Sequence, residues 1–201
     1  MTELLADVSR ETLEDLSTYA DLLKKWTGKI NLISRQTTDE IWERHILDSL
    51  QLSDMAPKTG DWIDLGSGGG LPGMVIAILS RGAVLDRHVT LVESDQRKCA
   101  FLRTATRELA LDVTIIPDRI DNIPPLHADI LSARALADLT TLLGFAERHM
   151  KPDGVALFPK GANWQQEVAD ARTRWSCDCE PITSKTNPSA AILRIKDIAR
   201  V

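Results

Sequence analysis

Glycine residues follow a short apolar run in a pattern that predicts a ligand-binding loop. Residues 64–73 read DLGSGGGLPG, with glycine at every second position from Gly66 to Gly70 and a proline where a helix would begin. Glycine is needed where the backbone takes a positive φ or where a ligand presses against the main chain. In open α/β sheets such a loop lies beyond the carboxyl end of a strand, which is where ligands bind. We therefore expect residues 64–73 to contact a small molecule.

Two kinds of ligand could suit this loop. Residues 68–73 match the G-x-G-x-x-G pattern of dinucleotide-binding proteins, so a nicotinamide-dependent or flavin-dependent oxidoreductase is one hypothesis. Asp64 precedes the glycines, however, and its charge would repel a pyrophosphate. The same charge would attract the ammonium and sulfonium groups of S-adenosyl-L-methionine (SAM), which carries no phosphate. The position of Asp64 therefore favours SAM.

A second carboxylate, Glu93, ends the apolar run 89–93. A carboxylate at the end of a neighbouring strand can accept hydrogen bonds from both hydroxyls of a ribose. Because NAD contains the same diol, Glu93 predicts a nucleoside without choosing between the two cofactors. The alternative interpretation of Asp64 and Glu93 is a helix cap or a surface charge.

Short apolar runs alternate with amphipathic stretches beyond residue 58. The spacing predicts strands at 62–65, 89–93, 113–116, 130–133, 155–158, 179–182 and 191–195, and helices at 72–81, 96–109, 136–150 and 164–174. This alternation predicts an α/β fold with a mostly parallel, seven-stranded, doubly wound sheet. Helices predicted at 11–26 and 38–55 would form an N-terminal helical cap. We expect a single domain with its cap at 1–58 and its Rossmann-like core at 59–201.

Composition narrows the class of protein. The chain has 201 residues, enough for one domain, and its 43% hydrophobic and 26% charged residues exclude a disordered or collagen-like polypeptide. No stretch approaches the ~20 apolar residues of a membrane span, and the acidic N-terminal residues do not resemble a signal peptide. Three cysteines are too few for a disulfide framework. We therefore expect a cytoplasmic protein, and nothing in the sequence indicates a metal site or an obligate dimer, so we expect a monomer without metal.

The net charge of −5 repels nucleic acid on average, so an RNA partner would need a local basic face. Two clusters could supply one, and the end of the strand at 155–158 could extend it. The candidate RNA contacts are Lys25 and Arg44 in the cap, Arg97, Lys98 and Arg103 on the helix at 96–109, and Lys160. A charge run is often only the solvated face of a helix. If the clusters flank the ligand site, they become plausible phosphate contacts.

Three blocks of sequence resemble the RsmG (GidB) family of bacterial 16S rRNA guanine-N7 methyltransferases. They are residues 25–34 (KWTGKINLIS), residues 44–49 (RHILDS) and the glycine loop at 64–73, and the similarity continues to residue 161. The block at 44–49 is much more specific than the loop, which many methyltransferases share. The resemblance implies a SAM-dependent methyltransferase fold, SAM as cofactor, and one guanine of 16S rRNA or of the small ribosomal subunit as substrate.

The resemblance also implies individual cofactor contacts. These are Gly66 and Leu71 in the loop, Ile120 and Asp121 beside the adenine, and Arg134 at the end of the fourth strand. Arg134, which we take as the catalytic residue, could pair with the carboxylate of SAM or grip an RNA phosphate. The family usually has serine directly before this arginine, whereas the chain has Ala133. Asp64, Gly68, Gly70 and Glu93, taken from the loop pattern, complete the expected cofactor site.

The expected chemistry agrees with what the sequence lacks. N7 of guanine carries a lone pair and no proton. Its methylation therefore needs only correct placement of the guanine against the methyl group, and neither a nucleophilic side chain nor a general base. Residues 134–137 read RALA, where amine methyltransferases usually carry Asn/Asp-Pro-Pro-aromatic. Cys99 is expected on a helix away from the site, which disfavours carbon-5 methylation of pyrimidines. Three alternatives stay open: a small-molecule methyltransferase, a nicotinamide-dependent oxidoreductase, and a non-catalytic RNA-binding module of ribosome assembly.

His45 and Asp48 lie three positions apart on one face of the predicted cap helix. This spacing suits either a buried polar clamp between the cap and the sheet or a lid over the methionine end of the cofactor. His45 could equally be an ordinary core histidine, and we assign it no catalytic role.

Overall fold

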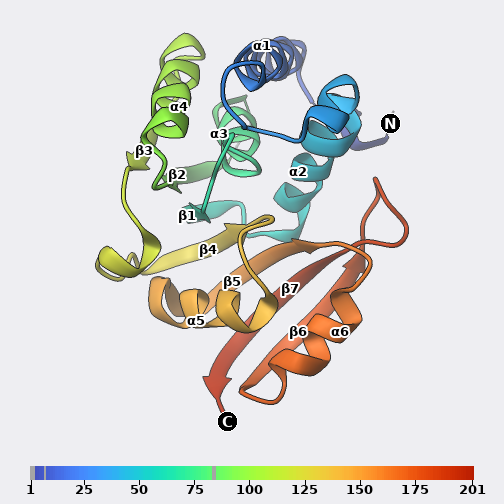
Figure 1. Cartoon of the computed structure of the whole chain (residues 1–201), viewed down its shortest axis with the longest axis vertical. Helices are drawn as coiled ribbons and strands as arrows, with labels where there is room; N and C mark the ends of the chain where they lie inside the picture. Colours follow the sequence, from blue (N-terminus) through green and yellow to red (C-terminus); the bar gives the residue numbers. More distant parts are fainter. Residues whose placement is uncertain (1–2, 7, 83–84) are drawn as a thin grey trace.

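A seven-stranded sheet forms the centre of the molecule in the computed structural model, which describes residues 3–6, 8–82 and 85–201. The strands follow the order β3-β2-β1-β4-β5-β7-β6 (Figure 1). Their bounds are β1 (Thr59–Leu65), β2 (Asp86–Val92), β3 (Val113–Ile116), β4 (Ala128–Ala133), β5 (Met150–Lys160), β6 (Trp175–Thr183) and β7 (Ala191–Arg200). Neighbouring strands are parallel except for β7, which runs antiparallel to both β5 and β6. The predicted fold class is confirmed.

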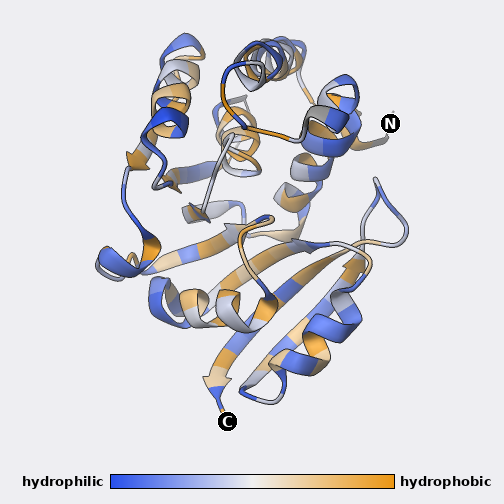
Figure 2. Ribbon diagram, viewed as in Figure 1, coloured by the Kyte–Doolittle hydropathy of each residue, from blue (hydrophilic) through white to orange (hydrophobic). Residues whose placement is uncertain are grey.

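Helices cover both faces of the sheet. They are α1 (Arg10–Thr27), α3 (Gly73–Gly82), α4 (Gln96–Glu108), α5 (Leu139–His149) and α6 (Trp164–Ala171). Along β1, Trp62 packs in the hydrophobic cluster of α1, α3 and α4, whereas Ile63 packs in the cluster of α5 and α6. This alternation is expected for a strand buried on both faces. At the sheet edge, Figure 2 shows alternating orange and blue bands along β6 and β7.

The cap shares its core with the sheet. Ser9 caps α1, and its hydroxyl accepts the backbone N–H of Thr12. Leu16 and Leu23 on α1 are wholly buried and belong to the same hydrophobic cluster as Trp62 of β1. The cap is therefore fixed to the same face of the sheet as α3.

The second predicted cap helix, at 38–55, is wrong as one regular helix. The chain instead forms a succession of short turns: η2 (Arg35–Glu40), the π-helical η3 (Trp42–Leu47), α2 (Asp48–Leu50) and η4 (Gln51–Met55). The hydroxyl of Thr37 donates to the backbone oxygen of Ser34, a local bond that competes with helical pairing. A π-helical turn, frequent at functional sites, follows within the RHILDS block.

The predicted start of the helix at 136–150 is also wrong. Helix α5 begins at Leu139, because the side chain of Asp138 accepts the backbone N–H of Thr141 and caps the helix. Residues 134–138 form an irregular segment, which we call the β4–α5 bend, and Ala135 within it has a φ of +53°. Strand β5 begins at Met150, five residues before the predicted strand at 155–158. Within the part of the chain that the structure describes, no helix has the length and apolar character needed to cross a bilayer.

Candidate functional site

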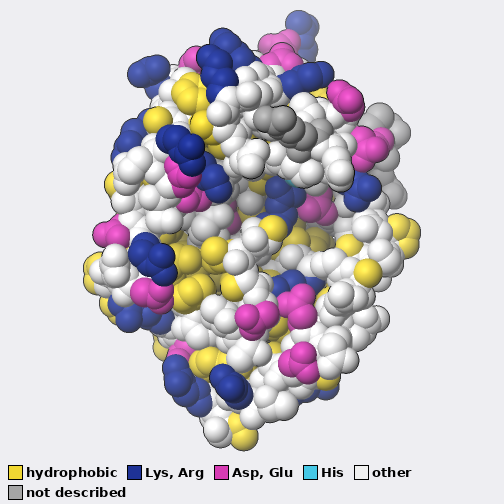
Figure 3. All heavy atoms as spheres, viewed as in Figure 1, with side chains coloured by type: hydrophobic (Ala, Val, Ile, Leu, Met, Phe, Trp, Pro, Cys, Tyr) yellow, Lys and Arg dark blue, Asp and Glu magenta, His cyan; other side chains and the backbone are white. Residues whose placement is uncertain are grey.

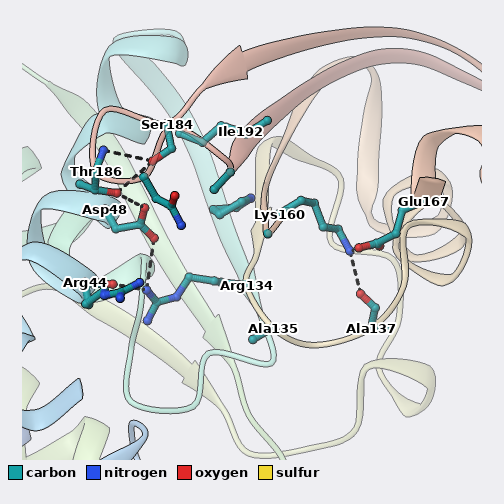
Figure 4. Close-up of a pocket in the computed structure, with 15 residues that line it drawn as sticks. Arg44, Asp48, Arg134, Ala135, Ala137, Lys160, Glu167, Ser184, Thr186 and Ile192 are labelled. Atoms are coloured by element: carbon teal, nitrogen blue, oxygen red, sulfur yellow. Dashed lines mark hydrogen bonds and ion pairs between the residues drawn. The ribbon is translucent and has the colours of Figure 1, made fainter. Parts of the chain in front are cut away.

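Three hollows meet at the β4–α5 bend, and Ala135 lines all of them. The loop hollow, about 380 Å³, lies between the glycine loop and the ends of β2 and β3. The strand-end hollow, about 360 Å³, lies between the cap, the end of β5 and the loop before β7 (Figure 4). The cap hollow, about 820 Å³, lies against residues 31–34. The bend therefore borders all three of these hollows.

The glycines of the loop are needed for different structural reasons. Gly66, Gly68 and Gly70 all have positive φ, at +64°, +58° and +85°. A Cβ on Gly70 would lie 2.4 Å from Cγ of Met74, so packing against α3 fixes this position. A Cβ on Gly68 would meet only the backbone oxygen of Gly66, at 3.8 Å. The space for a ligand is therefore above Gly68, whereas Gly70 faces the protein.

Tyr19 joins the cap to this loop, a contact that the sequence did not predict. Its hydroxyl donates to the backbone oxygen of Gly69, and the side chain is wholly buried. Burial raises the pKa of Tyr19 well above its usual value, so the phenol keeps its proton and stays a donor. In the sequence Tyr19 is one apolar position among many on α1, and its polar partner lies fifty residues away.

Glu93 is nearly buried and lines the loop hollow. One carboxylate oxygen, Oε2, accepts the N–H of Gly68 at 2.8 Å, and Oε1 accepts the N–H of Asp95 at 2.7 Å. Ile120 and Asp121, in the short helix η5 (Ile120–Asn122), line the same hollow as Gly66. Four of the predicted cofactor residues are therefore brought together. Lys98, predicted to contact RNA, lines this hollow as well.

Asp64 is placed below the loop and lines none of the three hollows described above. Its Oδ1 accepts the hydroxyl of Ser132 at 2.7 Å, and its Oδ2 accepts the N–H of Gly73 at 3.2 Å. Burial raises the pKa of Asp64 to about 6, against the lowering effect of these hydrogen bonds. The carboxylate thus occupies the N-terminus of α3, where a pyrophosphate would otherwise bind. Leu71 is buried as well and also lines none of these hollows.

Arg134 is held by the RHILDS block. Its Nη1 donates to Oδ2 of Asp48 at 3.4 Å and to the backbone oxygen of Arg44 at 3.2 Å, and its Nη2 donates to Nδ1 of His45 at 3.0 Å. Nε2 of His45 therefore carries the proton toward Thr37. Burial, followed by Arg134 and Arg44, lowers the pKa of His45 to about 4, so its ring is neutral at neutral pH. His45 and Asp48 are half-buried and both bond to Arg134 at the end of β4, so they join the cap to the sheet.

The loop between β6 and β7 contributes residues that the sequence did not predict. The hydroxyl of Thr186 donates to Oδ1 of Asp48 at 2.9 Å, and Gln51, which is wholly buried, bonds to Ser184 and to the backbone N–H of Lys185. Ser184 and Thr186 line the strand-end hollow beside Arg134 (Figure 4). In the sequence, a polar Gln51 between Leu50 and Leu52 is a weak signal for such a contact.

The predicted RNA contacts do not share one setting. Lys25, Arg44, Arg97 and Arg103 are exposed, although Arg44 pairs with Glu40 and Arg97 pairs with Asp95. Figure 3 shows Lys and Arg side chains over α1 and α4, at the top of the view, with acidic side chains between them. The structure therefore places four of the six at the surface, where RNA contact stays a prediction.

Lys160 was also expected to contact RNA at the surface, but the structure nearly buries it. Its side chain is only 8% exposed, and its Nζ donates to the backbone oxygen of Ala137 and to Oε2 of Glu167. A strand end at the rim of a sheet suggested exposure, but the β4–α5 bend and α6 cover it.

Comparisons with known proteins agree with one another. A family model described as "rRNA small subunit methyltransferase G" (GidB) matches residues 12–190. The chain is 57% identical to a protein of that name from Ruegeria sp. (strain TM1040), over 97% of the chain and 95% of the relative, and 52% identical to that of Ruegeria pomeroyi, over 97% and 96%. Its fold is similar to that of a SAM-dependent methyltransferase from Aquifex aeolicus, with a TM-score of 0.59, 12% identity, and coverage of 88% and 97%.

Proposed function

The chain belongs to the GidB family, rRNA small subunit methyltransferase G, and from this membership we propose that it transfers a methyl group from SAM to N7 of one guanine in 16S rRNA. The reaction would take place in the cytoplasm. The observation that carries the proposal is the loop hollow, which Glu93 lines, next to the open space over Gly68, whose N–H donates to Glu93. The expected cofactor contacts at Gly66, Glu93, Ile120 and Asp121 all line it.

The residues of the loop hollow fit SAM better than a dinucleotide. Each oxygen of Glu93 accepts one backbone N–H, and a carboxylate can accept about four hydrogen bonds, so Glu93 can still hold ribose hydroxyls. Asp64 takes the N–H of Gly73, the first residue of α3. A pyrophosphate there would lose this donor and face a negative charge. The nicotinamide-dependent alternative is therefore disfavoured by the structure of the loop itself.

Bound SAM supplies an electrophilic methyl group, and the protein has to align N7 with it. The strand-end hollow suits the flat base, because small side chains line it, namely Ala135, Ala137, Ala190 and Ala191. It joins the loop hollow along Ala135 and Ala137. Orientation of this kind can account for about 7 to 11 kcal/mol of the barrier.

The charges around Arg134 suit a product that becomes positive. Methylation at N7 converts a neutral guanine into a cation, and an unpaired guanidinium beside it would oppose the reaction. Asp48 compensates the charge of Arg134, and His45 is neutral. Arg134 can therefore orient the methionine carboxylate of SAM without adding net positive charge to the site.

A transfer assay tests the proposed function. Purified protein with methyl-labelled SAM and 16S rRNA or small subunits should yield 7-methylguanosine at one position. Absence of label from every form of the RNA, together with intact SAM binding, would indicate the non-catalytic RNA-binding module. Equally fast labelling of free guanosine nucleotides would indicate a small-molecule methyltransferase.

SAM affinity should depend on the ionisation of Asp64. Because its pKa is raised to about 6, the carboxylate is charged at pH 7.5 and protonated at pH 5. The charged form attracts the ammonium group of SAM, so affinity should fall as pH falls through 6, by up to about tenfold per pH unit for one linked proton. Calorimetric titration at several pH values measures this. Asp64→Asn should bind SAM with a flat pH profile, and an unchanged pH dependence in this variant would assign the titration to another group.

A further inference from the structure

Lys160 lines the strand-end hollow that we assign to the guanine, its side chain is nearly buried, and the proposed function gives it no task. Lysine is almost never this buried unless it is paired. Its Nζ lies 2.9 Å from the backbone oxygen of Ala137 and 2.7 Å from Oε2 of Glu167 (Figure 4). Both partners belong to other segments, so Lys160 at the end of β5 ties the β4–α5 bend to α6.

The same pair holds the start of α5. Oε2 of Glu167 also accepts the N–H of Leu139, the first residue of that helix, at 3.0 Å. The far end of the bend is thus fixed by Lys160 and Glu167, whereas its near end is fixed by Asp48 and His45 through Arg134. Side chains from four different segments replace the regular backbone pairing that the bend lacks.

The bend needs such external support. Ala135 has a φ of +53°, a conformation that non-glycine residues adopt only when their surroundings impose it. Leu136, next along the chain, lies against Gly66, because a Cβ on that glycine would come within 2.6 Å of Cδ1 of Leu136. A shift of the bend would therefore move Arg134 and change the space beside the glycine loop at the same time.

We propose that Lys160 is a positioning residue for methyl transfer, which acts through the β4–α5 bend and not through contact with RNA. The proposal rests on the proposed function for the identity of the reaction. It assigns to Lys160 the task of keeping Arg134 in place at the strand-end hollow and Leu136 in place at the loop hollow. The opposing interpretation is the one made from the sequence, in which the Lys160 ammonium contacts an RNA phosphate.

Lys160→Met separates the two interpretations, and Lys151→Met is its matched control. Lys151 lies near the opposite end of the same strand and also pairs with a carboxylate, Asp129, at 2.7 Å. We would measure SAM affinity by calorimetry, RNA affinity without SAM at several salt concentrations, and kcat and KM for RNA. Thermal unfolding would show that each variant is folded.

Positioning predicts that K160M weakens SAM binding several-fold and lowers kcat on the order of tenfold to a hundredfold, since small misplacements have effects of this size. RNA affinity and its salt dependence should equal those of the wild type, and K151M should match the wild type throughout. Lys160→Arg should also be impaired, because a planar guanidinium cannot replace the compact ammonium between its two acceptors.

The proposal is overturned if K160M keeps its SAM affinity and kcat while RNA binding weakens and its salt slope falls by about one, the signature of one lost phosphate contact. If K160M does not fold, Glu167→Gln gives the same comparison. Lower kcat with unchanged RNA affinity would support positioning, and wild-type kinetics would contradict it.

The measurement of SAM affinity keeps this test independent of the proposed function. If the wild type binds SAM but methylates no RNA, the proposed function is wrong. The effect of K160M on SAM binding would still test whether Lys160 is a positioning residue.

Discussion

Gly68→Val should abolish SAM binding while leaving the chain folded. The position has a φ of +58°, and its Cβ would extend into open space, with only the oxygen of Gly66 within 4 Å, at 3.8 Å. The protein therefore has no internal clash to avoid, and the added side chain enters the space expected for the cofactor. The left-handed backbone adds a cost of about 1–2 kcal/mol, more for a β-branched residue, which a domain stable by about 5–15 kcal/mol can tolerate.

Calorimetric titration with SAM checks this result, and Gly28→Val is its control. A Cβ on Gly28 would also meet only one atom, the oxygen of Lys25 at 3.8 Å, but φ there is −64° and the residue, the C-cap of α1, lines none of the three hollows. The control should bind SAM as the wild type does. Retained affinity in G68V would show that the cofactor does not approach the backbone at this glycine. If the wild type shows heat of binding with NAD(H) and none with SAM, the oxidoreductase hypothesis would be favoured instead.

Arg134→Ala should lower methyl transfer at least tenfold with little effect on folding. The side chain contributes no hydrophobic burial to the core clusters, but it bonds to Asp48, His45 and the backbone of Arg44 at the junction of two hollows. Its loss leaves Asp48 with Thr186 and Gln51 as partners, so the cap keeps part of this network. The effect should therefore appear in catalysis and in SAM affinity more than in the unfolding temperature.

Arg194→Ala provides the comparison for Arg134→Ala. Arg194 is also partly buried, pairs with Glu180 at 3.3 Å and donates to the backbone oxygen of Met55. It lies on β7 and lines none of the three hollows described here. Steady-state rates of methyl transfer for the two variants should differ at least tenfold. Equal rates in the two variants, or wild-type turnover in R134A, would show that Arg134 has no role in the reaction.

The strands and the glycine loop could be predicted because their signals are local. Residues 113–116 form a strand with the predicted bounds, and β1 ends at Leu65, directly before the glycines, as expected. The alternation of apolar runs and amphipathic stretches is set by burial on both faces of the sheet. Gly66, Glu93, Ile120 and Asp121 then meet because parallel strands end at one edge.

The polar network of the site could not be predicted because its partners are far apart in sequence. Arg134 bonds to residues about ninety positions earlier, and Gln51 bonds to Ser184 across 133 positions. Spacing along one helix or strand carries no information on such pairs. The setting of Lys160 was missed for the same reason, since a lysine at a strand end reads as exposed until α6 and the β4–α5 bend are placed over it.

The start of α5 shows a different limit, which is local competition. Apolar periodicity extends back to Leu136, but Asp138 is a good N-cap and its side chain accepts the N–H of Thr141. The helix therefore begins three residues later and leaves the bend that carries Arg134. Weighing the cap above the periodicity would have found this boundary.

Mass mapping of 16S rRNA from cells with and without this gene tests the central claim most directly. RNA from cells that lack the gene should miss a single methyl group, on N7 of one guanine. The wild-type gene should restore it, and a gene carrying Arg134→Ala should restore it poorly. Identical methylation in cells with and without the gene would contradict the assignment of this chain as the enzyme that modifies the small-subunit RNA.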